Sequence, residues 1–322
     1  RKTGKNYLLY ILCMVAGGTM AHSLIPPTPG PLFVAEELEV DLGTMMLVGL
    51  VIGLFPVGFG YAYAHWANRK WDIPLREEGT TASVEDGGAL PGERLPLWMA
   101  GLPILLPVAL IMSGSILKEV LSPEAMDSAG LRFLAAVSEK NMALTLSAMV
   151  AILLVLRRSG WSFQSSVGPV QKALLSGAGI ILITSAGGAF GAVLRQTGIA
   201  DSIQNWSSSA SGWALPTVFL VTMLVRTAQG SATVAMITAA PIAVAFADSG
   251  NLGFHPVYLA VVIGCGSKPI PWMNDSGFWV ITRMTGMKEA ETLKIVTPMM
   301  SLMGVVGLLV TMVAARILPL VS

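Results

Sequence analysis

The stretch LVRTAQGSATVAMITAAP, Leu224 to Pro241, places polar residues in the middle of an apolar segment. Arg226, Gln229 and Ser231 lie there beside a glycine, where a membrane-spanning helix is normally apolar. Inside hydrocarbon every backbone N–H and C=O needs a partner, so irregular backbone survives only within protein or beside a polar cavity. The sequence therefore predicts a helix that breaks over residues 227–233 and turns free amides and carbonyls toward such a cavity.

The whole chain has the composition of a membrane protein. Of its 322 residues, 53% are hydrophobic and only 12% are charged, and the mean hydropathy is +0.68. Soluble domains carry about 25% charged residues. Charge-free runs such as 42–68 and 297–315 reach the roughly 20 residues that a helix needs to cross a bilayer. They lack the alternation of barrel strands, so we expect an all-α, polytopic protein of the inner (plasma) membrane.

The remaining composition argues against several other classes. The formal net charge is +1 and no basic run stands out, so nothing supports a nucleic-acid partner. Three scattered His and two Cys predict neither a metal site nor a cofactor. An intramembrane enzyme is the weaker interpretation, because no G-x-S-x-G or H-E-x-x-H motif occurs.

Three further interruptions resemble the first. They are HSLIPPTPGP at 22–31, SAGGAFG at 185–191 and GSKPIPWMNDSGFW at 266–279. Transporters bind substrates at such half-helix ends, because the amide end carries roughly half a positive charge and favours anions. A kink or a surface loop is the alternative for any single interruption. Together they predict a transport site.

Four ionisable residues accompany these interruptions. Arg226 and Lys268 lie in apolar surroundings, where a cation is costly and usually functional, unless it snorkels to the interface or pairs with an acid. Asp275 could carry a proton, pair with one of these cations or cap a helix. His22 titrates near neutral pH, and its alternative role is a structural hydrogen bond. We predict that coupling or charge pairing uses these four residues.

The motifs RTAQGSATVAMITAA, SAGGAFGAVLRQTGIADSI, PPTPGPLFVAEELEVDLG and NDSGFW resemble the gluconate permease family over nearly the whole chain. The resemblance implies the ion-transporter superfamily, with inverted repeats that each hold a re-entrant hairpin and a discontinuous helix. It also implies proton-coupled uptake, or symport, of a small hydroxylated carboxylate such as gluconate.

The resemblance and the hydrophilic stretch together predict the organisation of the chain. Residues 1–67 would end the first repeat with a broken helix and a scaffold helix, and residues 68–96 would form a cytoplasmic linker. Residues 97–322 would form the second repeat, with a re-entrant hairpin at about 171–196, a broken helix at 213–247 and a C-terminal helix. We also expect one returning helix over residues 131–156.

Substrate-binding residues follow from the same resemblance. Backbone and hydroxyl groups at the interruptions would hold the carboxylate and hydroxyls of the substrate. The expected residues are Thr28, Gly30, Gly187, Gly188, Gly230, Ser231, Thr233 and Asn274.

The chain departs from the family in three places. Family members are longer at the N-terminus, where the first hairpin is expected, and a fragment without that hairpin should not transport. Thr28 stands where the family commonly has His, and Lys268 adds a cation in an atypical segment, which suits a smaller or more strongly anionic substrate. The alternatives are an anion channel, a non-transporting fragment, or a sodium-coupled transporter of another small organic anion. Membrane lipid and a second copy in a homo-oligomer are further expected partners.

Overall fold

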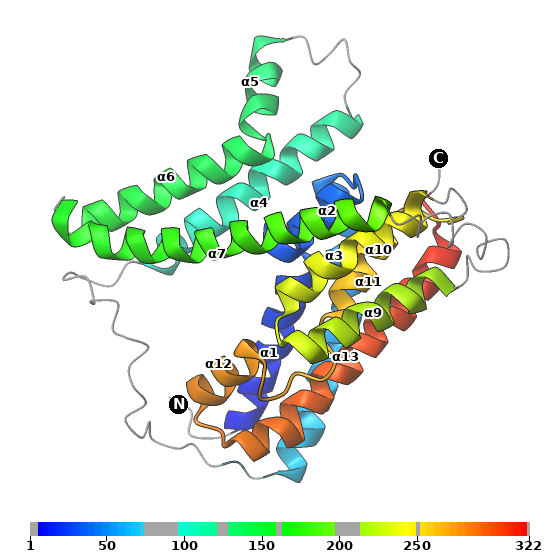
Figure 1. The fold of residues 1–322 in the computed structure, drawn as a ribbon. Coiled ribbons are helices and arrows are strands. Elements are labelled where there is room, and N and C mark those ends of the chain that lie inside the picture. The colour runs from blue at the N-terminus through cyan, green and yellow to red at the C-terminus, as the bar shows by residue number, and fades with distance from the viewer. Residues whose placement is uncertain are drawn as a thin grey trace. The chain divides into compact units, whose positions relative to one another are not determined.

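The computed structural model describes residues 6–71, 73, 96–120, 128–158, 163–196, 213–248 and 252–320. Within these ranges it contains helices and no strand. Contacts divide the chain into two units (Figure 1). One comprises Arg1–Val40, Thr44–Gly79 and Ile183–Ser322, and the other comprises Asp41–Gly43 and Thr80–Leu182.

The first unit is built from short half-helices and long spanning helices. Its helices are α1 (Tyr7–Leu24), α2 (Pro29–Glu37), most of α3 (Leu42–Lys70), α9 (Ala214–Gln229), α10 (Ala232–Asp248), α11 (Val257–Gly266), α12 (Ser276–Thr285) and α13 (Glu289–Ile317). The second unit holds α4 (Leu97–Val120), α5 (Ala129–Val137) and α6 (Lys140–Arg158). Helix α7 (Phe163–Gln196) contributes residues to both units.

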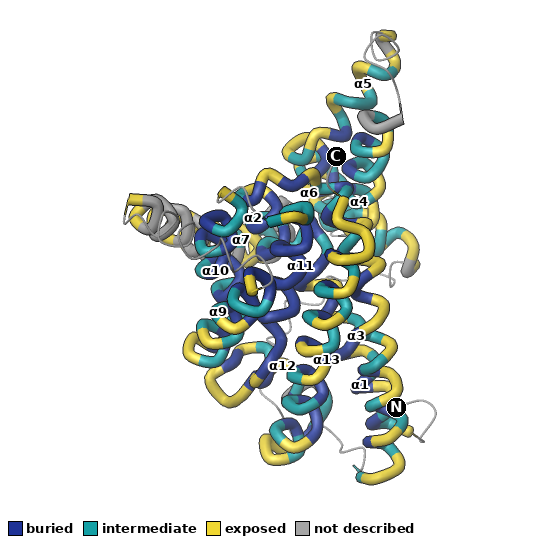
Figure 2. The backbone as a smooth tube through the Cα atoms, turned by 90° about the vertical axis from the view of Figure 1, so that its right-hand side faces the viewer, coloured by how far each residue is buried: buried dark blue, intermediate teal, exposed yellow. Residues whose placement is uncertain are grey.

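Helix α11 forms the centre of the first unit. All ten of its residues are buried, and it is dark blue along its length in Figure 2. It packs against α9, α13, α1 and α10. A side chain at Gly264 would collide with the carbonyl oxygen of Ser23 in α1, so the glycine allows these two helices to touch. The hydroxyl of Ser267 then donates to that of Ser23 at 3.1 Å.

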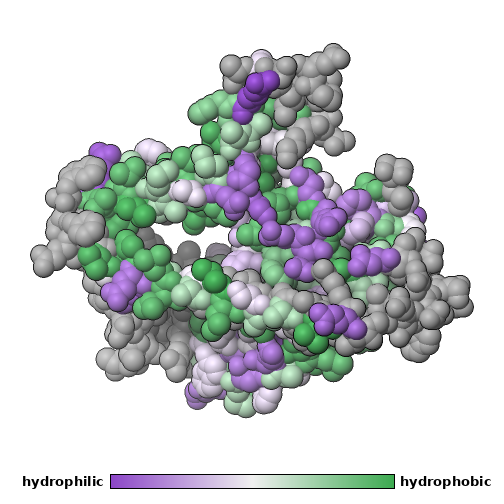
Figure 3. All heavy atoms as spheres, turned by 45° about the horizontal axis from the view of Figure 1, so that its top comes forward, coloured by the Kyte–Doolittle hydropathy of each residue, from purple (hydrophilic) through white to green (hydrophobic). Residues whose placement is uncertain are grey.

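Five helical segments of the described chain are long and apolar enough to cross a membrane. They are Tyr7–Glu37, Leu42–Lys70, Trp98–Leu117, Lys140–Arg157 and Glu289–Ile317. Large apolar side chains such as Leu54, Ile104 and Val313 are exposed on them, and green hydrophobic residues cover much of the surface in Figure 3. Exposed apolar surface of this extent is expected where lipid is the solvent. The all-α, polytopic membrane architecture and the discontinuous helices are thereby confirmed.

Two local expectations are wrong. Helix α7 runs through 185–191 without a break. A glycine within a helix costs about 1 kcal/mol relative to alanine, which is less than the cost of an unsatisfied backbone group in lipid. The tip of the re-entrant hairpin is therefore not at 185–191. The hairpin itself and the inverted repeats stay predictions.

The second correction concerns the single helix expected over 131–156. The structure ends α5 at Val137 and begins α6 at Lys140. The Glu139 carboxylate between them accepts hydrogen bonds from the backbone N–H groups of Asn141 at 2.9 Å and Met142 at 3.2 Å. It therefore caps the start of α6, an effect that apolar periodicity does not reveal.

Candidate functional site

The break between α9 and α10 lies at Gly230 and Ser231, within the predicted interval. Gly230 adopts a left-handed conformation with φ of 75°, and its N–H donates to the carbonyl of Arg226 at 2.8 Å. A Cβ on this residue would also collide with the carbonyl oxygen of Asn274. Glycine is therefore required both by the backbone angle and by the close approach of a second chain segment.

That second segment joins α11 to α12 and satisfies the end of α9. The side-chain amide of Asn274 donates to the carbonyls of Thr227 at 2.9 Å and Ala228 at 3.2 Å. The indole Nε1 of Trp272 donates to the Thr227 carbonyl at 2.9 Å. Carbonyls in the last turn of a helix lack partners within the helix. The second interruption therefore supplies hydrogen-bond donors to the helix end at the first.

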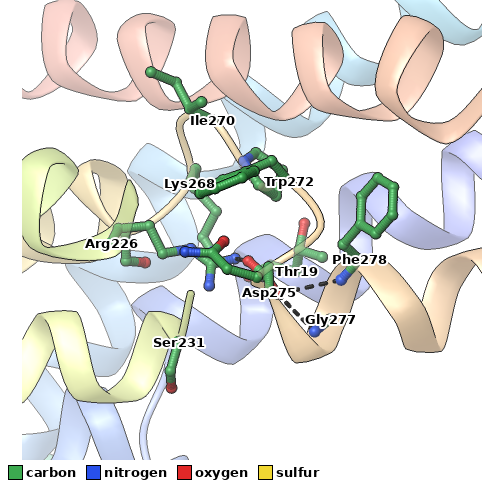
Figure 4. Close-up of polar contacts among 12 residues, drawn as sticks. Thr19, Arg226, Ser231, Lys268, Ile270, Trp272, Asp275, Gly277 and Phe278 are labelled. Carbon is green, nitrogen blue, oxygen red and sulfur yellow. Dashed lines mark hydrogen bonds and ion pairs between the residues drawn. The ribbon is translucent and has the colours of Figure 1, made fainter. Parts of the chain in front are cut away.

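A buried ion pair joins the same two breaks. Arg226 near the end of α9 pairs with Asp275 just before α12, and their side chains are 5% and 2% exposed. The Asp275 Oδ1 also accepts from the backbone N–H of Gly277 at 2.6 Å and of Phe278 at 3.2 Å, drawn as dashed lines in Figure 4. Asp275 thus serves as a helix cap and as a charge partner, two of the three roles expected for it. The Arg226 Nε is buried, with no hydrogen-bond partner among the described residues.

Lys268 lies close to this pair without belonging to it (Figure 4). It is 2% exposed, and its Nζ donates to the backbone carbonyl of Thr19 in α1 at 2.7 Å. This bond ties the segment after α11 to the middle of α1. The lysine places a second buried cation beside one carboxylate.

A cavity of about 350 Å³ opens where these elements meet. Its lining includes Ser231 and Thr233 at the start of α10, Ser276 and Gly277 at the start of α12, and Thr19 of α1. Arg226, Lys268 and Asp275 lie in its wall. Each helix start carries roughly half a positive charge, and the three side chains contribute two cations against one carboxylate. The cavity is therefore suited to a small anion with hydrogen-bonding groups.

The structure brings six of the predicted residues to the cavity. They are His22, Arg226, Ser231, Thr233, Lys268 and Asp275. Gly230 and Asn274 lie beside it, in the contact between the two breaks. The remaining predictions for substrate contact stay untested.

Two of the expected residues lie elsewhere, and two more cannot be placed relative to the cavity. Among the described residues, the cavity lining includes neither Thr28 nor Gly30. The Thr28 hydroxyl donates to the Ile25 carbonyl at 2.7 Å, and Gly30 packs against Met236 of α10. Gly187 and Gly188 belong to α7, and their surroundings lie outside the described residues.

Sequence reasoning missed Thr19, Ser276 and Gly277 as lining residues. The last two carried a usable signal, because an aspartate before Ser-Gly indicates a capped helix start. Nothing in the pattern around Thr19 indicates its contact with Lys268.

Known proteins resemble the chain along most of its length. The inner membrane permease YgbN of Escherichia coli (strain K12) is 30% identical, over 90% of this chain and 64% of the relative. The low-affinity gluconate transporter of the same strain is 29% identical, over 99% of this chain and 70% of the relative. The D-serine transporter DsdX of Escherichia coli (strain K12) is 28% identical, over 96% of this chain and 68% of the relative. The chain thus spans 64% to 70% of the length of these relatives.

These relatives are permeases and transporters rather than enzymes. No solved structure matches the chain. The family model described as GntP family permease matches residues 1–317. The chain is a multi-pass membrane protein that belongs to the GntP family of permeases.

Proposed function

We propose that the protein is a secondary active transporter of the inner membrane for a small hydroxylated carboxylate of the gluconate type. One observation carries the proposal: two helices start at a cavity whose wall also holds two buried cations. The volume of about 350 Å³ lies within the roughly 300–1,000 Å³ common for small-molecule sites. The names of the gluconate and D-serine transporters support small hydroxylated molecules with a carboxylate group as the substrate class.

The chemistry of the wall suggests how such a substrate would bind. Its carboxylate would be attracted by the cations and by the amide ends of α10 and α12. Its hydroxyls would exchange hydrogen bonds with Ser231 and Thr233, which line the cavity as donors and acceptors. Alternating access would then rearrange the half-helices around this position.

We further propose that a proton moves with the substrate, in symport. His22 lines the cavity and is an exposed residue, whereas Asp275 lies buried in the cavity wall. Either side chain can change its charge by taking up one proton. Their contact with one cavity is what supports a coupling role for them.

Counterflow in proteoliposomes tests the transport proposal. Vesicles containing the reconstituted protein are loaded with unlabelled gluconate and diluted into labelled gluconate, and saturable accumulation is expected. Protein-free vesicles and an excess of an uncharged polyol outside serve as controls. Absence of uptake across a panel of sugar acids and hydroxy acids would contradict the proposal.

The same vesicles separate the alternatives. For proton symport, a protonophore abolishes accumulation driven by a pH gradient, and removal of sodium leaves it unchanged. The opposite pattern would establish sodium coupling. A non-saturating ionic current would instead identify an anion channel.

A further inference from the structure

We propose that Lys268, rather than Arg226, binds the carboxylate of the substrate, and that this lysine makes the site selective for singly charged anions. The inference rests on the proposed function, because it concerns the same cavity. It assigns to one side chain the selection for ligand charge within the substrate class proposed above.

Arg226 is already committed to another carboxylate. Its partner Asp275 is fixed by the backbone N–H groups of Gly277 and Phe278. Both members of the pair are at least 95% buried. A substrate that took Arg226 would have to leave Asp275 buried without its cation, and such a break is strongly unfavourable.

Lys268 has no comparable partner. An ammonium group can donate three hydrogen bonds, and within the described part of the chain its Nζ has one acceptor, the neutral carbonyl of Thr19. No carboxylate there lies within ion-pair distance of it. Burial of an ammonium without a counter-charge is costly, and an anion in the adjoining cavity would supply that charge.

The charges of the wall set the charge of the ligand. Among the side chains of the wall, and with His22 neutral, Arg226 and Asp275 neutralise each other, which leaves the single positive charge of a protonated Lys268. A monoanion balances this charge, an uncharged analogue leaves it unbalanced, and a dianion exceeds it. Ser231 and Thr233 line the same cavity, so their hydroxyls serve the uncharged polyol part of the ligand.

A merely structural role for Lys268 is the competing explanation, because its bond to Thr19 also holds α1 in place. The two explanations differ in charge selectivity. If the lysine is structural, its replacement weakens binding of every ligand alike. If it binds the carboxylate, its replacement affects the anion and spares the uncharged analogue.

Equilibrium binding to the purified protein in nanodiscs tests this difference with three probes: gluconate, the uncharged gluconamide and the dianion glucarate. Wild-type protein is expected to bind gluconate most tightly. Lys268→Gln should weaken gluconate binding about 10- to 100-fold, the range for a hydrogen bond to a charged group, and leave gluconamide binding unchanged. Lys268→Arg should restore the preference for gluconate. Lys294→Gln, at an exposed lysine of α13 outside the cavity lining, is the matched control.

The outcomes separate the inference from the proposed function. If wild-type protein binds gluconate and Lys268→Gln retains the full preference over gluconamide, the inference is wrong and the function stands. If wild-type protein binds none of the sugar acids, both the inference and the proposed function are wrong. The probe series on wild-type protein needs no variant, so equal affinity for all three probes would overturn the inference even if Lys268→Gln fails to fold.

Discussion

Replacement of Asp275 by Asn would isolate the charge of Arg226 without removing the helix cap. An asparagine Oδ1 accepts hydrogen bonds from the same N–H groups that Asp275 binds, at the start of α12. The variant differs from the native protein chiefly by the loss of one negative charge. Arg226 and Lys268 would then share a buried wall with no carboxylate between them.

The burial of both side chains sets the size of the effect. With exposures of 5% for Arg226 and 2% for Asp275, solvent screens the pair little. Removal of one partner from a buried pair costs about 3–5 kcal/mol. At 2–4 °C per kcal/mol for an unfolding unit of 150–250 residues, the size range of the unit that contains the pair, this corresponds to an apparent Tm lower by roughly 6–20 °C.

The reverse replacement should cost less. In Arg226→Gln, the Asp275 carboxylate keeps its two amide donors, and Lys268 remains in the same wall as a positive charge. Asp275→Asn leaves two cations and no such compensation. We therefore expect Asp275→Asn to be the more destabilising of the two single variants.

Thermal unfolding of both single variants and the double variant in one detergent provides the assay. The double variant contains no isolated charge in this pair, so its loss of stability should be clearly smaller than the sum of the two single losses. Single variants within about 1 kcal/mol of wild type, the range of exposed pairs, would refute the reasoning. Strict additivity in the double variant would refute it equally.

Three other expectations concern the breaks and the end of the chain. Gly230→Ala should lower stability by more than the roughly 1–2 kcal/mol of a left-handed alanine, because its Cβ would meet a backbone carbonyl. Gly253, with φ of 66° and open space around it, is the control. Gly253→Ala should show only the loss of stability from the backbone angle in the same unfolding assay. Asn274→Ala, which removes two hydrogen bonds to α9, should lower stability by about 1–3 kcal/mol, and Trp272→Phe, which removes one, by about 0.5–1.5 kcal/mol; an unchanged Tm in both would contradict their capping role. Burial lowers the pKa of His255, whose Nδ1 accepts from a backbone N–H of α11. The stability of the wild-type protein should therefore fall as pH drops below the pKa of an unfolded histidine, about 6.5. His255→Asn should show a flatter dependence of stability on pH.

Much of the architecture could be predicted from the sequence because it follows from local composition. Charge-free runs indicate spanning helices. The polar insertion around Gly230 indicates a break over residues 227–233, and the structure places the break between Gln229 and Ala232. The same rule failed at SAGGAFG, since glycine weakens a helix without offering its backbone another partner. It also missed the cap at Glu139, which splits the helix expected over 131–156.

The site was less predictable because it depends on contacts between distant segments. The sequence indicated that Arg226, Lys268 and Asp275 were unusual, and it left their pairing open. Only the fold shows that Arg226 forms the ion pair with Asp275 and that Lys268 donates a hydrogen bond to α1. Asn274 was expected to contact substrate, yet its amide donates to carbonyls 46 and 47 positions earlier in the chain, a distance over which no periodicity is informative.

The position of the bound substrate is the most direct test of the account. A cryo-electron microscopy structure of the protein with gluconate should show ligand density in the cavity lined by Ser231, Lys268 and Gly277, with the carboxylate within hydrogen-bond distance of the lysine Nζ. Density at a different position, or an uninterrupted helix through Gly230, would contradict it.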